Sequence, residues 1–495
     1  MRILLVYPQY VYHDTFDART PSLSLLYLAS ILEKDGHQVK IFNTSEGPIT
    51  QVKYGYLYGI SNEEVFNSFQ QENYDLVGIT CSFASRWHYV LEQATLFKKL
   101  WPCVPIVIGG LFPTYEWEYC FRKSKDIDAI VLGEGEHALS GIARKLDGGD
   151  SIADACGSVE GVVWRDGEIV KKKDKTGYIE DLDNLPFPAW HLLDLNNFFK
   201  TQKIFYELRP PYFTVLSSRS CPEACSFCNM FITHGRKWRT RSPENFVDEL
   251  EYLINKFNVN SFFIADDNFS FDLERAKNIC REILKRNLNI NYNTGNGLNI
   301  KRVDNELFTL MKASGCGSIV LAIESGSERI RNEVYKKRLT TENIYQVVNW
   351  CYEVGIPSIG CFMVGAPGEN RESVNETKKL IQDLPLTLCT CSIYTPYPKT
   401  RLYDKCVEMG YLKEIDPGSE SRVEFVSSML STPDFSPEDV KAWQKEIYFH
   451  ILKHKWPQLL KELLKPNGIV NFSNFSILKR LFDIKGVSSK LKRKW

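Results

Sequence analysis

Residues 213–229 read Phe-Thr-Val-Leu-Ser-Ser-Arg-Ser-Cys-Pro-Glu-Ala-Cys-Ser-Phe-Cys-Asn and carry the strongest chemical signal in the chain. The apolar run at 213–216 predicts a buried strand, and three cysteines follow it at positions 221, 225 and 228. Thiolates at this spacing fit three corners of an iron–sulfur cube, whereas a cluster held by protein alone takes four cysteines. The next cysteine along the chain is Cys280, far beyond the loop. We therefore expect an iron–sulfur cluster with one iron left open for an exogenous ligand.

Other uses of the three cysteines fit less well. A structural zinc ion takes four ligands, and His234 is the one further candidate close in sequence. A redox Cys-x-x-Cys pair would leave Cys221 without a role. The other cysteines are scattered along the chain, as is typical of reduced, buried, small apolar residues in a reducing compartment. We expect a cytoplasmic protein.

The composition is that of an ordinary globular protein. The 495 residues indicate about three domains. Lys+Arg and Asp+Glu both total 61, so the balanced charge predicts no nucleic-acid partner. No apolar stretch reaches the roughly 20 residues of a membrane-spanning helix. The apolar run at the N-terminus is followed by no cleavage site of a signal peptide, so we expect it to form a first buried strand.

The second half of the chain repeats a strand–helix pattern six times, which predicts a partial (β/α)6 barrel of the TIM type across 207–430. The expected strands are 213–216, 261–265, 289–292, 318–323, 358–364 and 390–394. Helical patterns separate them, for example at 243–257, 273–286, 305–314 and 341–353.

Residues 1–150 also alternate strands and helices, which favours a doubly wound α/β domain of the Rossmann type. The expected strands are 3–7, 38–42, 75–80, 105–109 and 129–132, with a helix at 22–34. Small or polar residues follow the last three of these strands: Ser82, Gly109, Gly110, Gly133 and Glu134. Ligands of doubly wound sheets bind outside the carboxyl ends of the strands, where glycine permits close approach. A ligand crevice is expected there.

Two regions flank the barrel. Residues 151–206 contain a hairpin signal at Asp166-Gly167 and a proline-punctuated stretch at 181–188, so we interpret them as a hairpin and linker. Residues 431–495 have apolar residues at helical spacing, interspersed lysines and a basic tail at 490–495. Two interpretations stay open: a helical lid with a solvated tail, or an interfacial element that contacts a membrane or a lipid-like substrate.

The Cys-x₃-Cys-x₂-Cys loop after the first barrel strand resembles the radical S-adenosylmethionine (SAM) enzyme family. The resemblance implies a [4Fe–4S] cluster held by Cys221, Cys225 and Cys228, which form the catalytic metal site. The fourth iron would be chelated by S-adenosylmethionine. One electron, from a flavodoxin or ferredoxin, would then cleave S-adenosylmethionine to methionine and a 5′-deoxyadenosyl radical.

Further segments match this family in order. In the family, an aromatic at the position of Phe227 lies against the adenine of S-adenosylmethionine. Asp266 and Asp267 end the second barrel strand, where the family contacts the amino group. Glu324 and Ser325 end the fourth strand, near the ribose or the methionine end. Gly365 belongs to a glycine-rich motif beside the adenine, and Tyr394-Thr-Pro-Tyr-Pro-Lys-Thr400 resembles a Pro-Tyr-Pro-Gly-Thr segment with Lys399 at the glycine.

The order of a flavodoxin-like domain, an Asp181-Leu-Asp-Asn-Leu-Pro-Phe-Pro188 linker and the cysteine loop resembles the cobalamin-binding subgroup of this family. The resemblance implies cobalamin at the five strand-end residues named above. The histidine motif for the lower axial ligand, Asp-x-His-x-x-Gly, is absent, and His13, His37, His88 and His137 stand in other contexts. Cobalamin without a histidine ligand is therefore expected.

The function implied is cobalamin-dependent methylation of an unactivated carbon in a small-molecule or lipid-like substrate. Radical cyclisation, rearrangement or carbon–carbon coupling is the alternative enzyme class, with the cobalamin domain vestigial or in another role. A degenerate cofactor-binding scaffold is the non-enzyme alternative.

Overall fold

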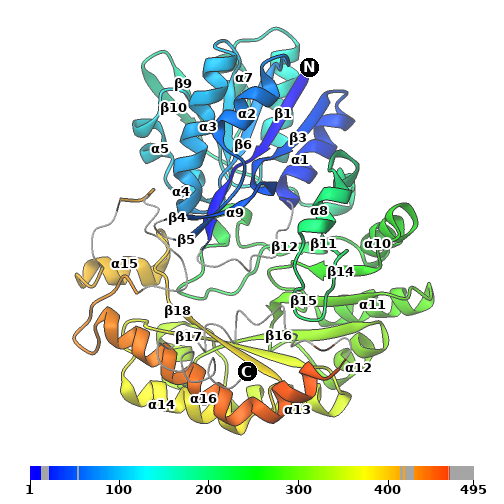
Figure 1. Ribbon diagram of the computed structural model, residues 1–495, viewed down its shortest axis with the longest axis vertical. Helices are drawn as coiled ribbons and strands as arrows, with labels where there is room; N and C mark the ends of the chain where they lie inside the picture. Colours follow the sequence, from blue (N-terminus) through cyan, green and yellow to red (C-terminus); the bar gives the residue numbers. More distant parts are fainter. Residues whose placement is uncertain (13–21, 53–54, 413–415, 419–427, 466–467, 469–495) are drawn as a thin grey trace, which may run out of the picture. The chain divides into compact units, whose positions relative to one another are not determined.

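The computed structural model describes residues 1–12, 22–52, 55–412, 416–418, 428–465 and 468 (Figure 1). Its chain divides into two compact units. Unit 1 comprises Met1–Thr201 together with Met230–Gly235 and Glu414–Val423, and unit 2 comprises the remainder. His13 and the basic tail at 490–495 lie outside the described residues.

Unit 1 is built on a seven-stranded sheet in the order β10-β9-β8-β7-β6-β1-β3. Its five parallel strands, numbered along the chain, follow the order 2-1-3-4-5, which is the flavodoxin-like arrangement. The expected domain class and all five expected strands are confirmed. The parallel strands are β1 (Arg2–Tyr7), β3 (Gln38–Asn43), β6 (Leu76–Thr80), β7 (Ile106–Gly109) and β8 (Ala129–Val131).

Helices cover both faces of this sheet because its strands are apolar on both sides. In β1, Leu4 and Val6 point into one core, whereas Ile3 and Leu5 point into the other. The helices of unit 1 are α1 (Leu23–Lys34), α2 (Asn62–Phe69), α3 (Trp87–Leu100), α4 (Leu111–Tyr115), α5 (Trp117–Lys123), α6 (Glu136–Asp147), α7 (Ile152–Ser158), α8 (Leu195–Thr201) and α9 (Phe231–His234). Single 3₁₀ turns are η1 (Thr44–Glu46), η2 (Ala84–Arg86), η3 (Leu182–Asn184) and η4 (Trp190–Leu192).

The hairpin of β9 (Val162–Asp166) and β10 (Ile169–Lys173) forms around Asp166-Gly167 as expected. It is not part of a free linker, however, because β9 pairs antiparallel with β8 and extends the first sheet. This pairing covers the strand edge that β8 would otherwise expose. A second, three-stranded antiparallel sheet of β2 (Tyr10–Tyr12), β5 (Gly55–Tyr58) and β4 (Ile49–Val52) was not expected from the sequence.

Unit 2 contains six parallel strands in chain order, β11-β14-β15-β16-β17-β18, which confirms the partial barrel. The strands are β11 (Phe213–Val215), β14 (Ser261–Ile264), β15 (Asn291–Leu298), β16 (Cys316–Glu324), β17 (Ser358–Val364) and β18 (Leu388–Ile393). The helices are α10 (Pro243–Phe257), α11 (Leu273–Lys285), α12 (Asn305–Ala313), α13 (Thr341–Val354), α14 (Arg371–Asp383), α15 (Arg401–Glu408) and α16 (Pro437–Leu463), with a π-helical turn η5 (Ile330–Val334).

The C-terminal helix α16 covers the open edge of this sheet (Figure 1, orange). The Cys391 amide in β18 donates to the Tyr448 hydroxyl at 3.3 Å, and the Gln444 side chain donates to the Cys391 carbonyl at 2.8 Å. These contacts use backbone groups that an edge strand leaves unpaired. The expected helical C-terminal region is thus confirmed as far as Leu463. None of the described helices is long and apolar enough to cross a membrane.

Candidate functional site

A two-stranded ladder closes the cysteine loop at its base. The short strands β12 (Ser218–Arg219) and β13 (Arg239–Thr240) pair antiparallel on either side of the loop. Cys221, Cys225 and Cys228 lie between them as partly exposed thiols that form no disulfide. The Cys228 amide donates to the Cys225 carbonyl at 3.4 Å, which turns the chain between the last two thiols.

Three consecutive residues after β14 hold the beginning of the loop. The Asp266 carboxylate accepts from the Ser217 amide at 2.6 Å and from the Ser217 and Ser218 hydroxyls at 2.5 and 2.6 Å. Asp267 accepts from the Ser220 amide at 3.2 Å. The structure therefore gives both carboxylates a role in positioning the loop, where the sequence indicated contacts with the cofactor.

Asn268, the third of these residues, contacts a cysteine directly. Its Nδ2 lies 3.3 Å from the Cys221 sulfur, and the side chain is buried. The Trp238 indole N–H donates to the Asn268 carbonyl at 3.1 Å and keeps the residue in place. Hydrogen bonds to cluster sulfurs are one of the means by which proteins set a cluster's potential.

The middle of the loop is held from two other strand ends. Glu223 accepts from Lys301 at 2.6 Å and from Asn299 at 3.0 Å, just after β15. Burial alone would raise the pKa of Glu223, but the contacts with Lys301 and Asn299 outweigh burial, and the pKa is lowered. The Ser226 hydroxyl donates to the Val334 carbonyl at 2.5 Å. The peptide around the cysteines is therefore positioned by protein contacts alone.

Phe227, between the second and third cysteines, packs edge-on against Tyr335 with ring centroids 5.3 Å apart. Tyr335 is buried and follows η5 directly. Phe227 itself remains partly exposed. A flat group bound near the cysteines therefore finds an aromatic side chain held in one orientation.

One partly buried cation, Lys337, lies near Cys225. The Lys337 ammonium lies 2.7 Å from Glu324, which ends β16, and also donates to the Ala322 carbonyl. Burial would lower the pKa of Lys337, but Glu324 and Cys225 outweigh it and raise the pKa. Burial raises the pKa of the Cys225 thiol, and Lys337 opposes that rise. Burial likewise raises the pKa of Cys221.

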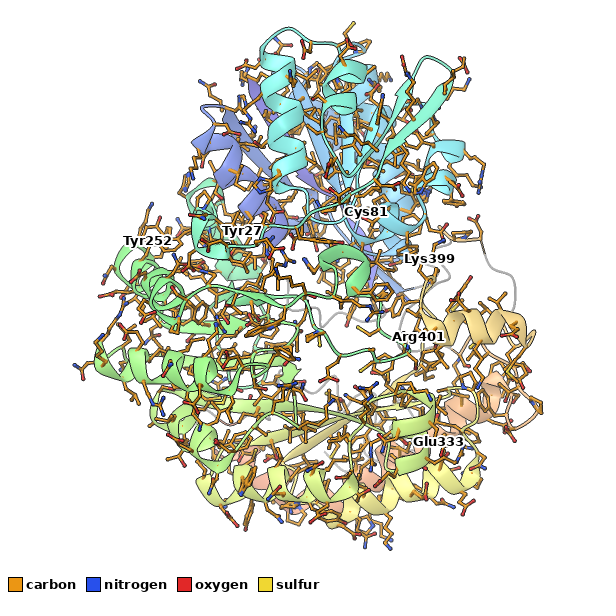
Figure 2. The ribbon with its side chains drawn as sticks, turned by 180° about the vertical axis from the view of Figure 1, so that it is seen from behind. Tyr27, Cys81, Tyr252, Glu333, Lys399 and Arg401 are labelled. Atoms are coloured by element: carbon orange, nitrogen blue, oxygen red, sulfur yellow. The ribbon has the colours of Figure 1, made fainter. Side chains whose placement is uncertain are left out.

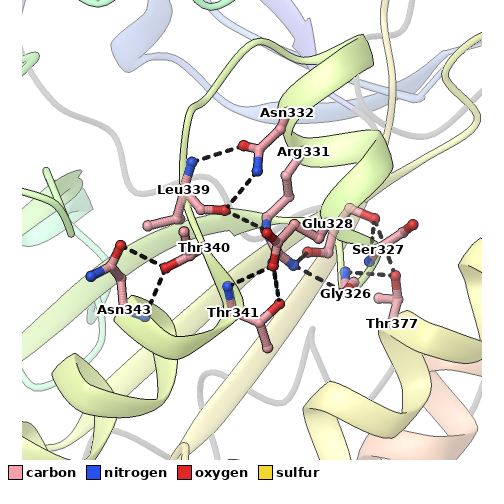
Figure 3. Close-up of polar contacts among 11 residues, drawn as sticks. Gly326, Ser327, Glu328, Arg331, Asn332, Leu339, Thr340, Thr341, Asn343 and Thr377 are labelled. Atoms are coloured by element: carbon pink, nitrogen blue, oxygen red, sulfur yellow. Dashed lines mark hydrogen bonds and ion pairs between the residues drawn. The ribbon is translucent and has the colours of Figure 1, made fainter.

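The turn after Glu324 is organised by a buried guanidinium (Figure 3). Arg331 donates to the carbonyls of Ser325 and Gly326 at 2.7 and 3.0 Å and to that of Leu339 at 3.2 Å. The Ser325 hydroxyl accepts from the Ser327 amide at 3.2 Å and lies 3.4 Å from the Thr377 hydroxyl. Ser325 therefore has hydrogen-bond partners within the turn. Glu324, which directly precedes the turn, has a φ of 70°, and the turn holds it in this conformation.

The glycine-rich turn after β17 needs glycine for two reasons. Gly365 has a φ of 96°, and a Cβ there would lie 2.7 Å from Val440 of α16. Its amide and that of Ala366 donate to the buried Glu369 carboxylate at 2.5 and 3.0 Å. Burial raises the pKa of Glu369 to about 7, against the effect of these hydrogen bonds.

In unit 1, Gly110 is needed by the chain itself. It has a φ of 109°, and a Cβ there would lie 2.6 Å from the carbonyl oxygen of Cys81, which follows β6 (labelled in Figure 2). Gly109 is different, because its Cβ would meet only Val131 at ordinary distances of 3.6 and 3.9 Å. Ser82 follows Cys81 at the same end of the sheet. Gly109 is thus the position whose missing side chain leaves room beside a strand end.

Gly133 and Glu134 contact the short segment that follows the cysteine loop. The Glu134 carboxylate lies 3.0 Å from Nδ1 of His234, and a Cβ at Gly133 would lie 2.9 Å from the Thr233 carbonyl. Lys175 donates to the Glu134 carbonyl at 2.8 Å. The structure therefore gives Glu134 a side-chain partner in α9, where the sequence indicated a cofactor contact.

The structure describes five histidines in unit 1: His37, His88, His137, His191 and His234. His37 is buried just before β3, and His88 pairs with Glu92 along α3 at 2.9 Å. His191 pairs with Glu33 at 3.0 Å and His234 with Glu134. His137, in α6 just after β8, lines a surface hollow together with Glu134. That cobalamin is held without a histidine ligand stays a prediction.

Four residues that the sequence did not single out complete the site: Asn268, Ser226, Lys337 and Arg331. Asn268 directly follows two residues that the motif already contained, and Ser226 lies between two of the cysteines. Lys337 and Arg331 lie in a charged stretch after β16 that reads as an ordinary solvated loop. The burial of Arg331 and the ion pair of Lys337 with Glu324 distinguish them, and neither can be read from the sequence.

The donor set fits an iron–sulfur cluster better than a single ion. Among the described residues, no three histidine, cysteine or carboxylate groups converge as they would around one metal ion. The thiolates of a cubane bind different irons and so stand apart. Three partly exposed cysteines on a loop held at five points match that requirement.

Comparison with known proteins agrees with the fold and the site. Residues 215–381 match the family model described as "Radical SAM superfamily", and residues 11–143 match the one described as "B12 binding domain".

The chain is 26% identical over 473 residues to an uncharacterized methyltransferase of Pyrococcus horikoshii, covering 95% of this chain and 96% of that one. It is 28% identical over 453 residues to cytidylyl-2-hydroxyethylphosphonate methyltransferase of Streptomyces wedmorensis, covering 84% and 82%. The fold resembles the radical S-adenosylmethionine methyltransferase TsrM of Kitasatospora setae, solved with cobalamin and a [4Fe–4S] cluster, with a TM-score of 0.69, 16% identity and coverage of 97% and 99%.

Both cofactor domains are therefore identified in one chain, in the order expected from the sequence. The protein is a radical S-adenosylmethionine enzyme that also carries a B12-binding domain.

Proposed function

We propose that this enzyme methylates an unactivated carbon of a small-molecule substrate, with two molecules of S-adenosylmethionine consumed per methyl group transferred. The observation that carries the proposal is the presence, in one chain, of a positioned three-cysteine loop and a flavodoxin-like B12-binding domain. The relatives named as methyltransferases support the same reaction class. When bound, the cluster supplies the electron that cleaves S-adenosylmethionine, and cobalamin supplies the transferable methyl group.

We assign Cys221, Cys225 and Cys228 to the cluster. Phe227 and Gly365 are assigned to the adenine, and Glu324 to the ribose or methionine end. The loop is already held by Asp266, Asp267 and the ladder of β12 and β13, so the thiols need little rearrangement on binding the cluster. Burial raises the pKa of the Cys221 and Cys225 thiols, so binding a cluster, whose ligands are thiolates, releases protons there.

For unit 1 we assign Gly109 and Ser82 to cobalamin. Gly109 is the glycine whose missing Cβ the protein does not itself require. Gly110, Gly133 and Glu134 are assigned to packing within unit 1, because Gly110 lies against Cys81 and the other two lie against α9. We propose a flavodoxin or ferredoxin as electron donor and the cytoplasm as the compartment, since iron–sulfur clusters and free thiols both favour reducing conditions.

The test is anaerobic reconstitution with iron, sulfide and hydroxocobalamin, followed by incubation with S-adenosylmethionine and a strong reductant. We expect formation of 5′-deoxyadenosine from cluster chemistry and of S-adenosylhomocysteine from methyl transfer to the reduced cofactor. Cys225→Ala should abolish 5′-deoxyadenosine yet keep bound cobalamin, and the buried Cys316→Ala should retain both. Formation of 5′-deoxyadenosine without any S-adenosylhomocysteine, in cobalamin-loaded protein, would favour radical chemistry without methyl transfer.

A further inference from the structure

The later part of α16 exposes an unusual surface, which we call the α16 face. Four large apolar side chains on it are open to solvent: Phe449 is 62% exposed, Trp456 50%, Leu460 42% and Leu464 76%. Their spacing of seven, four and four residues places them along one side of the helix. Isolated exposed apolar residues are common, but a continuous row of large ones marks a contact surface.

Lysines outnumber carboxylates around this row. Between Lys441 and Lys465 the exposed lysines stand at positions 441, 445, 453, 461 and 465, and the Glu446 side chain is 42% exposed. The two carboxylates in this stretch are both occupied. Glu446 pairs with Arg371 at 2.6 Å and with Lys378 at 3.4 Å, and the buried Glu462 pairs with Lys465. The α16 face is therefore apolar and cationic, although the whole chain has no net charge.

A surface hollow of about 400 Å³ lies beside Phe449, between α14 and α16. Its lining residues are Lys378, Lys445, Glu446, Phe449, His450 and Lys453. Since Lys378 pairs with Glu446, the ammonium groups of Lys445 and Lys453 are the ones at this hollow that suit an anionic group such as a phosphate. An apolar ring at its rim suits the chain attached to that group.

The opposite side of α16 explains why the row faces outward. Val440, Ile447 and Ile451 are buried against the barrel. Farther along, Leu459 packs with Ile359 and Leu388, which lie at the beginnings of β17 and β18. The helix thus has a separate apolar side for folding, and the exposed row is not needed for it.

We propose that the α16 face docks on an anionic phospholipid membrane, with Phe449, Trp456, Leu460 and Leu464 inserted at the interface and the lysines against the headgroups. A helix with Trp, Phe and Leu on one side and lysines around them is suited to the plane of the interface.

The test is sedimentation of the full-length protein with vesicles of equal parts phosphatidylglycerol and phosphatidylcholine, and with phosphatidylcholine alone. We expect binding to the anionic vesicles at low salt and its loss at high salt. The double variant Lys445→Gln/Lys453→Gln should weaken partitioning roughly 30-fold, the equivalent of about 1 kcal/mol per lysine. Trp456→Glu/Leu460→Glu should weaken it roughly tenfold or more, because apolar insertion is lost.

Tyr352→Glu is the matched control, since this side chain is 69% exposed on α13 of the same unit and lies outside the α16 face. It should bind like the unchanged protein. Circular dichroism and 5′-deoxyadenosine formation should be unchanged in all variants, which separates this proposal from the proposed reaction. Absence of binding to anionic vesicles overturns the proposal. So does unchanged binding of both double variants, because another part of the chain then carries it. Self-association that Trp456→Glu/Leu460→Glu abolishes, without vesicle binding, overturns it in favour of a second copy of the chain.

Discussion

Replacement of Arg331 by methionine tests whether the turn that presents Glu324 depends on one buried guanidinium. In the folded protein, Arg331 is fully buried and supplies donors to the carbonyls of Ser325, Gly326 and Leu339 (Figure 3). It also donates to the Thr341 hydroxyl at 2.6 Å. Methionine preserves much of the volume but provides no donor, so the three carbonyls lose their partner.

A buried polar group without a partner costs about 1–3 kcal/mol. Three carbonyls therefore give a loss of roughly 3–5 kcal/mol, after allowance for the desolvation cost that disappears with the charge. Since a domain is stable by about 5–15 kcal/mol, this loss is large. The stability of Arg331→Lys should lie between those of Arg331→Met and the unchanged protein, because one ammonium group cannot reproduce the planar guanidinium that spans these acceptors.

The assay is urea unfolding of the full-length protein, followed by far-ultraviolet circular dichroism, with the transition of unit 2 compared between variants. Arg371→Met is the control, since that side chain is exposed and its ion pair with Glu446 should contribute less than about 1 kcal/mol. In folded Arg331→Met protein, weaker binding of S-adenosylmethionine should accompany the loss of stability. A stability within about 1 kcal/mol of the unchanged protein would refute the assigned role.

Three further predictions concern the cofactor sites and pH. Asn268→Ala should lower the reduction potential of the reconstituted cluster, measured by redox titration with electron paramagnetic resonance, because a hydrogen bond to the Cys221 sulfur is removed; an unchanged potential with full iron content would contradict this. Gly109→Leu should fold normally and lose bound cobalamin, measured as cobalt after gel filtration, whereas Gly110→Ala should destabilise unit 1 because its Cβ would meet Cys81; full cobalamin binding by Gly109→Leu would remove Gly109 from the site. Burial raises the pKa of Glu207 to about 7, so the folded state favours the protonated acid and stability falls as pH rises from about 4.5 through about 7. The stability difference between Glu207→Gln and the unchanged protein should therefore change by about 3 kcal/mol across that window in denaturation curves, and a pH-independent difference would show that Glu207 does not titrate there.

Local sequence patterns predicted most of the architecture. The helix at Pro243–Phe257 begins and ends where its helical pattern indicated, and all eleven expected strands form. These features depend on periodicity and turn chemistry within a few residues, and both are present in a single segment of chain. The three-cysteine spacing is equally local, because a tight loop must carry ligands close together in sequence.

The roles of individual polar residues depended on contacts that only folding creates. Asp266 binds Ser217, 49 residues away, and Glu134 contacts His234, 100 residues away. From sequence, both carboxylates stood at strand ends where ligands bind, and nothing local distinguished a ligand contact from a structural partner. The same holds for Gly110, where the Cys81 carbonyl by itself leaves no room for a Cβ.

The sequence alone therefore determined the class of each unit, the order of the strands along the chain and the position of the three-cysteine loop that we assign to the cluster. The tertiary structure decided which strand-end groups are free to meet a cofactor, because burial and hydrogen-bond pairing are set by segments far apart in the chain. It also decided that the apolar residues of α16 divide into a packed side and an exposed row. Helical periodicity places residues on faces, but only the packed barrel determines which face is covered.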